Sequence, residues 1–119
     1  MTEMTYAQAA RLGLQEEMAR DPKVWALGED LGYEGGMAGQ YNDLQAEFGP
    51  DRIVDTPISE STIMGAAVGA ALAGTRPIAE MRFSDFAMCS VSELVNQAAK
   101  ARYMFGGQAR VPMVARMPI

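Results

Sequence analysis

The sequence has no histidine and a single cysteine, Cys89, in 119 residues. Without histidine the chain cannot contain a Ser-His-Asp triad or a histidine-based zinc site. One thiol cannot form an internal disulfide and is typical of a reducing compartment. Because no histidine is present to activate it, we predict that Cys89 is a small buried residue on a helix and not a nucleophile.

Long apolar runs and blocks of positive charge are also missing. The run of small and apolar residues at 63–73 is too short to span a bilayer, and the N-terminus lacks the pattern of a secretion signal. The net charge of −5 argues against a surface that follows nucleic-acid phosphates. Apolar residues make up 49% of the chain, which is enough for one packed core. We therefore expect one cytoplasmic domain that binds neither membranes nor nucleic acid.

Helical and extended patterns alternate along the chain. Apolar runs predict buried strands at 24–27, 52–56, 77–81 and 111–117. Capping residues and helical spacing predict helices at 5–20, 41–48, 59–74 and 84–103. The glycines of 28–39 predict a long loop that is mobile or contacts a ligand. This order predicts an α/β fold, with a parallel sheet and flanking helices.

The third predicted helix begins beside an acid, Glu60, directly after a buried strand. We expect Ser59 or Ser61 to cap this helix, and the helix dipole stabilises a carboxylate in its first turn. Open α/β sheets bind ligands at the carboxyl ends of their strands, so Glu60 is well placed to reach one. From the residues alone, a plain capping role is the alternative.

Four other residues near the ends of predicted strands could take part in binding or catalysis. Phe86 follows the third strand, where a place in the core is the alternative to a ligand contact. Glu29 and Asp30 end the first strand and point to opposite faces of an extended chain. On the residues alone, one of these acids is expected to be solvated and the other to form a turn. Arg82 is expected to touch substrate or to pair with Asp85.

Three ordered segments carry a resemblance to a known family. Residues 55–60, 65–71 and 74–80 resemble the beta subunit of thiamine-diphosphate-dependent 2-oxoacid dehydrogenases, and 102–107 resembles most the acetoin dehydrogenase branch. The resemblance implies the pyrimidine-binding domain of a transketolase-like fold. A parallel sheet needs helices on both faces, and the sequence stops after its last predicted strand. Residues 1–119 are therefore expected to be the N-terminal portion of that domain, incomplete at the C-terminus.

The resemblance also assigns roles to single residues. Glu60 falls on the catalytic glutamate that hydrogen-bonds the aminopyrimidine ring of thiamine diphosphate. Phe86 falls on the position that stacks on this ring, and Ile58 on a residue that lines the same pocket. Glu29 matches an acid in a relay between two cofactors. The diphosphate and Mg²⁺ are expected to be held by a partner alpha subunit, so no metal site is predicted in this chain.

The family's activity is oxidative cleavage next to a carbonyl, with acyl transfer to a lipoyl group. The resemblance implies a heterotetramer with an alpha subunit and a second beta subunit, and a lipoyl-bearing transacylase core as partner. The isolated chain is then expected to be inactive. One alternative is a non-catalytic assembly module or truncated fragment that folds with a partner subunit. Another is the pyrimidine-binding half of a split transketolase or synthase.

Overall fold

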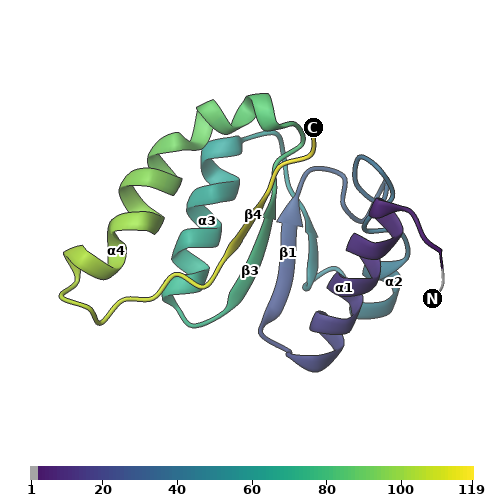
Figure 1. Cartoon of the computed structure of the whole chain (residues 1–119), viewed down its shortest axis with the longest axis horizontal. Helices are drawn as coiled ribbons and strands as arrows, with labels where there is room; N and C mark the ends of the chain where they lie inside the picture. Colours follow the sequence, from purple (N-terminus) through teal and green to yellow (C-terminus); the bar gives the residue numbers. More distant parts are fainter. Residues whose placement is uncertain (1–2) are drawn as a thin grey trace.

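The sheet at the centre of the molecule has four parallel strands, as the computed structural model of the chain shows for residues 3–119 (Figure 1). The strand order is β2-β1-β3-β4, and each neighbouring pair is parallel. All strands therefore end at one edge of the sheet, here called the carboxyl edge. The strands are β1 (Val24–Gly28), β2 (Ile53–Asp55), β3 (Arg76–Glu80) and β4 (Val114–Arg116).

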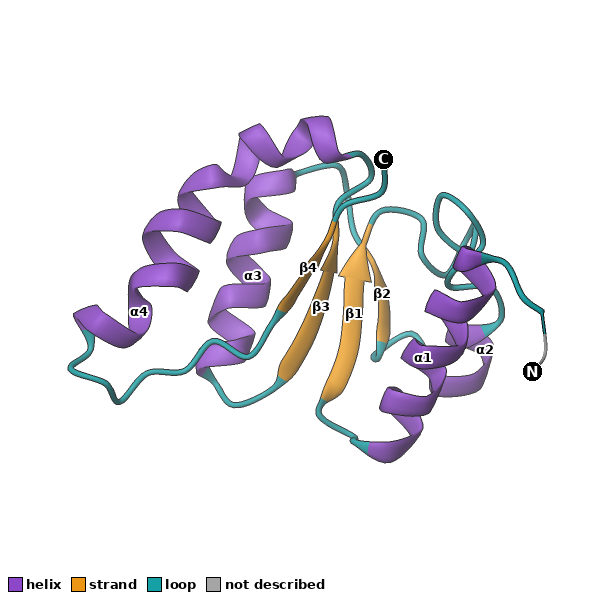
Figure 2. Cartoon of the chain, in the orientation of Figure 1, coloured by secondary structure: helices purple, strands orange, loops and turns teal. Residues whose placement is uncertain are grey.

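Helices cover both faces of the sheet, which confirms the predicted α/β fold (Figure 2). One face carries α1 (Tyr6–Arg20) and α2 (Leu44–Phe48), and the other carries α3 (Glu60–Leu72). The segment after β3 packs along α3 and ends in α4 (Ala99–Met104). No helix in residues 3–119 combines the length and the apolar character that a membrane crossing requires.

Side chains of the strands alternate between two core clusters, as the pleat of a strand requires. Ala26 and Ile53 pack with Leu14 and other residues on the α1 side. Leu27 packs with Ile63 and other residues of α3 on the opposite side. Neighbouring residues at the strand ends therefore present their side chains to different faces of the sheet.

The start of α1 and the end of α3 are fixed by residues that the sequence signals. The hydroxyl of Thr5 accepts a hydrogen bond from the Gln8 backbone N–H at 3.2 Å, and the Gln8 side chain accepts one from Thr5 N–H at 2.8 Å. This capping box was predicted. At the end of α3, Gly74 has φ 97°, and the Thr75 N–H reaches the Ala70 carbonyl at 3.1 Å. Glycine suits this left-handed position, which confirms the predicted end of the helix.

The helix predicted at 84–103 is confirmed in its extent, but its winding changes along the span. It consists mainly of a 3₁₀ helix, η1 (Ser84–Ser90), a π-helical turn, η2 (Glu93–Ala98), and α4. The spacing of apolar residues does not distinguish 3₁₀, α and π helices, because each of them can place residues three to five positions apart on the same side. The stripe of apolar residues marks a core face only in part, since Leu94 packs against the core on the α3 side while Val95 is 51% exposed. Cys89 is exposed in η1, so its predicted burial is wrong.

Two other elements are shorter than predicted. The helix expected at 41–48 begins only at Leu44, because Asp43 adopts a left-handed φ of 65° that a helix cannot contain. The strand expected at 111–117 is limited to β4. Before β4, Met113 N–H bonds to the Val111 carbonyl at 2.9 Å, so the chain turns there and does not extend.

Candidate functional site

The four predicted site residues all lie at the carboxyl edge of the sheet. Glu29 directly follows β1, Ile58 lies between β2 and α3, Glu60 is the first residue of α3, and Phe86 lies in η1 after β3. The Ser61 hydroxyl donates to the Cys89 carbonyl at 2.5 Å, which ties the first turn of α3 to η1. The structure thus brings Glu60 and Phe86 onto elements that are directly joined.

Glu60 is half-buried, and the helix that it begins has no side-chain cap. Ser59 stands at the N-cap position, but its hydroxyl donates to the Thr62 hydroxyl at 2.8 Å. Ser61 bonds to η1, so the predicted capping by either serine is wrong. The positive end of α3 therefore lacks a capping side chain beside the Glu60 carboxylate, and its dipole favours negative charge there.

Glu29 is buried, with 9% of its surface exposed, and its Oε1 atom has no hydrogen-bond partner in the described part of the chain. Burial raises the pKa of the Glu29 carboxyl, repulsion from Glu60 and Asp30 raises it further, and Arg82 opposes the shift. One acid of the pair was expected to be solvated, and Glu29 is not that acid. The alternation of side chains along β1 and the influence of Glu60 place this carboxyl on the α3 side of the carboxyl edge.

Asp30 is the turn-forming acid of the pair. It has a left-handed φ of 53°, and its carbonyl accepts hydrogen bonds from the N–H groups of Glu34 and Gly36, both at 3.1 Å. Its carboxylate pairs with Arg82 at 2.7 Å, and the second guanidinium nitrogen of Arg82 reaches Glu34 at 3.0 Å. The expected pairing of Arg82 with Asp85 is therefore wrong. Arg82 closes the loop at its beginning.

Two apolar side chains at this edge are exposed to solvent. Ile58 is 80% exposed, and Phe86 is 40% exposed. Phe86 contacts Phe83 edge-to-face, with ring centroids 5.7 Å apart and an interplanar angle of 86°. Phe86 is thus not a core residue. Such surfaces are available to pack against a flat ligand or a partner chain.

The opposite face of the same edge holds a buried acid that the sequence analysis missed. Glu80 is 3% exposed, and its Oε1 atom accepts a hydrogen bond from Gln40 at 2.9 Å. Its Oε2 atom accepts one from the Tyr41 hydroxyl at 2.9 Å and pairs with Arg116 Nε at 3.2 Å. Burial and the nearby Glu80 raise the pKa of the Tyr41 phenol well above its usual value.

The Glu80 network fastens the end of the glycine-rich loop, as Arg82 fastens its beginning. The signals in the sequence were an acid inside the apolar run at 77–81 and a glycine at the end of β1. A Cβ atom at Gly28 would lie 2.9 Å from both the Cβ and the carbonyl oxygen of Glu80, so only glycine fits there. Asp55 adds a third attachment, since its carboxylate accepts the Gly32 N–H at 2.7 Å.

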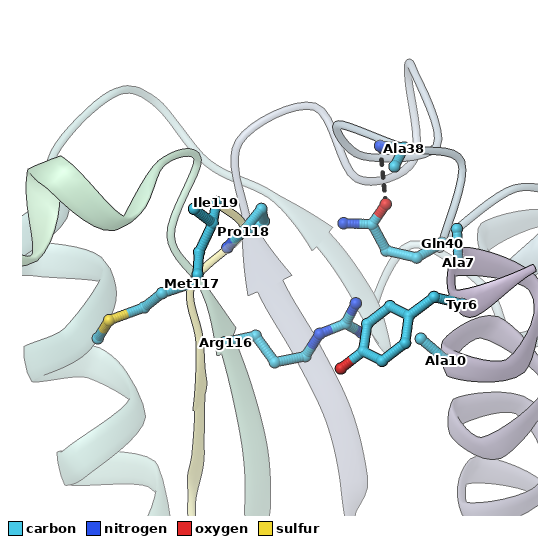
Figure 3. A pocket seen from close by; sticks show the side chains of 9 residues that line it. All are labelled: Tyr6, Ala7, Ala10, Ala38, Gln40, Arg116, Met117, Pro118 and Ile119. Carbon is cyan, nitrogen blue, oxygen red and sulfur yellow. Dashed lines mark hydrogen bonds between the residues drawn. The ribbon is translucent and has the colours of Figure 1, made fainter.

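A cavity of about 490 Å³ lies on the α1 side of the sheet (Figure 3). Figure 3 shows its wall of α1 and loop residues facing the last four residues of the chain. Gln40 lines it and accepts a hydrogen bond from the Ala38 N–H at 2.8 Å. None of the four predicted site residues lines this cavity, so it is separate from the predicted cofactor site.

Comparison with known proteins identifies the fold family. The family model "Transketolase, pyrimidine binding domain" matches residues 2–119. The 2-oxoisovalerate dehydrogenase subunit beta of Bacillus subtilis is 45% identical over 99% of this chain and 36% of its own length. The pyruvate dehydrogenase E1 component subunit beta of Rickettsia bellii is 47% identical over 98% of this chain and 36% of its own length.

A third relative belongs to the acetoin branch. The acetoin:2,6-dichlorophenolindophenol oxidoreductase subunit beta of Cupriavidus necator is 49% identical over 87% of this chain and 33% of its own length. The chain thus spans about a third of the length of these relatives. The resemblance to dehydrogenase beta subunits is confirmed, while the similar identities do not separate the branches. The chain belongs to the transketolase pyrimidine-binding domain family.

Proposed function

We propose that this chain forms one wall of a thiamine-diphosphate site in a 2-oxoacid or acetoin dehydrogenase component. The activity of the whole component would be oxidative cleavage next to a carbonyl, with acyl transfer to a lipoyl group. The observation that carries the proposal is the buried Glu29 carboxyl, whose Oε1 atom has no hydrogen-bond partner among residues 3–119 and whose pKa is raised in part by repulsion from Glu60. A carboxyl group placed in this way costs free energy unless a water, a partner chain or a ligand satisfies it.

The residues at this edge fit an aminopyrimidine ring. Such a ring is flat and carries hydrogen-bonding nitrogen atoms along its rim. Glu60 would bond to a ring nitrogen and hold or release a proton there, while Phe86 would stack on the ring and Ile58 would pack against it. When bound, thiamine diphosphate supplies the carbanion-stabilising chemistry at its thiazolium ring. Glu29 would extend the acidic path from Glu60 toward a second cofactor site.

The proposal places Mg²⁺ and the diphosphate on a partner alpha subunit. The glycine-rich loop supports this division, because several of its backbone N–H groups are already bonded within the chain. Gly32 N–H bonds to Asp55, Gly36 N–H to Asp30, and Ala38 N–H to Gln40. A second beta subunit and a lipoyl-bearing transacylase core complete the proposed partners. The heterotetrameric state and a location in the cytoplasm stay predictions.

The proposal is tested by co-expressing the chain with an alpha subunit and measuring cofactor binding and turnover of the complex. Calorimetry with thiamine diphosphate and Mg²⁺ should give saturable binding. Glu60→Gln keeps the size of the side chain but removes its acidity, so kcat should fall by about 10²- to 10⁴-fold. Glu16→Gln, at an exposed position of α1, serves as the matched control. Unchanged turnover of Glu60→Gln would contradict the proposed role.

A second candidate function is that of an assembly module without catalysis. It is favoured by the apolar side chains that η1, η2 and α4 leave uncovered. Met88 is 79% exposed, Val95 51% and Met104 68%. A surface of this kind suits a partner chain. A stable complex with the alpha subunit that binds no thiamine diphosphate would support this candidate over the first.

A further inference from the structure

Two buried oxygen atoms at the ends of β1 and β2 have no hydrogen-bond partner within residues 3–119. They are Oε1 of Glu29 and Oγ1 of Thr56. The Thr56 N–H donates to the Gly28 carbonyl at 2.9 Å, which continues the pairing of β1 with β2 by one residue. Thr56 therefore lies beside Glu29 at the carboxyl edge.

Both side chains belong to the α3 face of the sheet. Asp55, the residue before Thr56, accepts hydrogen bonds on the α2 side, from Gly32 at 2.7 Å and from Gln45 at 3.5 Å. Because side chains alternate along a strand, Thr56 points the other way. Leu27 packs on the α3 side, and Glu29, two residues later, follows the same alternation. The electrostatic influence of Glu60 on Glu29 agrees with this placement.

A hydroxyl in this position destabilises the fold if it stays unpaired. Valine has nearly the same shape as threonine and would fill the site without a polar atom to satisfy. A buried water needs two to four polar partners. The Glu29 and Thr56 oxygens supply two, and the half-buried Glu60 carboxylate is a third group at the same edge.

We propose that Thr56 is a positioning residue of the cofactor site, whose hydroxyl and the Glu29 carboxyl together hold one ordered water that fixes the orientation of this carboxyl beside Glu60. The inference rests on the proposed function, since it concerns the same wall. Thr56 does not touch the reacting atoms. It acts through Glu29, by filling the hydrogen-bonding capacity that the protein leaves open at Oε1.

The experiment compares two threonines in the complex with the alpha subunit. The Thr75 hydroxyl lies at the opposite edge of the sheet and is satisfied, because it accepts from Trp25 Nε1 at 3.1 Å and donates to the Ala70 carbonyl at 2.9 Å. Thr56→Val and Thr75→Val thus make the same chemical change at an unpaired and at a paired site. Three quantities are measured for each variant: the Kd of thiamine diphosphate in Mg²⁺ by calorimetry, kcat, and the thermal midpoint of the cofactor-free complex.

For Thr56→Val we expect a kcat lowered roughly ten- to a hundredfold, because a misplaced acid acts poorly. The thermal midpoint should not rise, because the variant removes one partner of the ordered water. Thr56→Ser, which keeps the hydroxyl, should restore most of the rate. Thr75→Val should lower the thermal midpoint and leave kcat unchanged. If Thr56→Val does not assemble, Thr56→Ala replaces it, with the same expected loss of rate and rescue by Thr56→Ser.

Two results would overturn the inference. If Thr56→Val keeps the wild-type kcat and Kd, the hydroxyl is an unpaired group without a positioning role, while the proposed function stands on Glu60→Gln. A double variant, Thr56→Val with Glu29→Gln, adds a check, because two residues that act as a unit give no further loss of rate. If the wild-type complex binds no thiamine diphosphate, the proposed function and this inference fail together.

Discussion

The two faces of the carboxyl edge each hold a buried glutamate, and the two glutamates differ in their partners. Glu80, on the α1 side, is bonded to Gln40, Tyr41 and Arg116. Glu29, on the α3 side, has an Oε1 atom without any partner among residues 3–119. A fully bonded buried acid holds the fold together, whereas an acid with free hydrogen-bonding capacity is available to a ligand. Residue type and burial alone do not separate these cases.

The apolar side chains repeat this contrast. On the Glu80 side, Arg116 stacks over the Tyr41 ring, with its guanidinium carbon 5.1 Å from the ring centroid. On the Glu29 side, Ile58 is 80% exposed. The buried acid on the Glu80 side is therefore enclosed by its own bonding partners, two of which also line the cavity of Figure 3, whereas the apolar side chain on the Glu29 side is left open. Substitutions on the Glu80 side should change stability, and those on the Glu29 side should mainly change binding.

The largest effect is expected for Glu80→Leu. This change removes the shared acceptor and leaves the Tyr41 hydroxyl, the Gln40 amide and the Arg116 guanidinium without their partner. The free energy of unfolding should fall by about 3–5 kcal/mol, as is typical when one partner of a buried charge network is removed. Urea unfolding at pH 7 measures it, with exposed Glu16→Leu as control. A loss below about 1 kcal/mol would show that the network does not anchor the loop.

Tyr41→Phe should have an intermediate effect. It removes one hydrogen bond to a charged acceptor and keeps the ring under Arg116, so a loss of about 1.5–3 kcal/mol is expected. The matched control is Tyr33→Phe, since Tyr33 is 85% exposed. An equal loss in the free energy of unfolding for the two variants would show that the hydroxyl of Tyr41 does not stabilise the Glu80 side of the sheet.

Asp55→Ala should cost less, about 1 kcal/mol, because Asp55 is exposed and its main bond is to one backbone N–H. The change also frees the start of the loop at Gly32. Hydrogen exchange of the Gly32 amide tests this directly. Protection that is as high as in the wild type would mean that the other attachments alone hold the loop.

Glu29→Gln should give the smallest effect and the opposite sign. Because burial raises the pKa of Glu29, the folded state binds this proton more tightly than the unfolded state, and its stability falls as the pH rises through the raised pKa. A neutral glutamine avoids this loss. The variant should therefore be more stable than the wild type at pH 7, and the gain should vanish as the pH falls below about 4, where both states are protonated. A series of unfolding measurements across pH checks it, and a variant less stable at pH 7 would contradict the contrast.

Local signals allowed much of the fold to be predicted. The capping box at Thr5, the glycine at position 74 and the alternation of apolar runs are each decided within a few residues, and all agree with the structure. The helical span at 84–103 was predictable, but its changes of winding were not, because helical spacing does not distinguish 3₁₀, α and π turns. The second helix began late because one left-handed residue, Asp43, was not signalled.

The candidate site was predictable to a different degree. A carboxylate at the start of α3 follows from the pattern around Glu60, but its role came from the family resemblance. The environment of Glu29 depends on burial by residues distant in sequence. The partners of Glu80 lie 36 to 40 positions away in the chain, at Arg116, Gln40 and Tyr41. Contacts over such distances produce no periodic pattern in the sequence from which they could be predicted.

The bond between Trp25 and Thr75 makes the molecule a potential optical reporter. Trp25 is the sole tryptophan of the sequence, and its indole N–H bonds to the hydroxyl of Thr75, three residues after the last residue of α3. The helix α3 has 13 residues and is about 20 Å long, and Glu60 lies at its N-terminal end, opposite the end near Thr75. A tilt of α3 on ligand binding at Glu60 would strain the hydrogen bond between Trp25 and Thr75 and change the emission of Trp25. Ligand binding at the carboxyl edge of the sheet would thus change the fluorescence of a residue at the opposite edge.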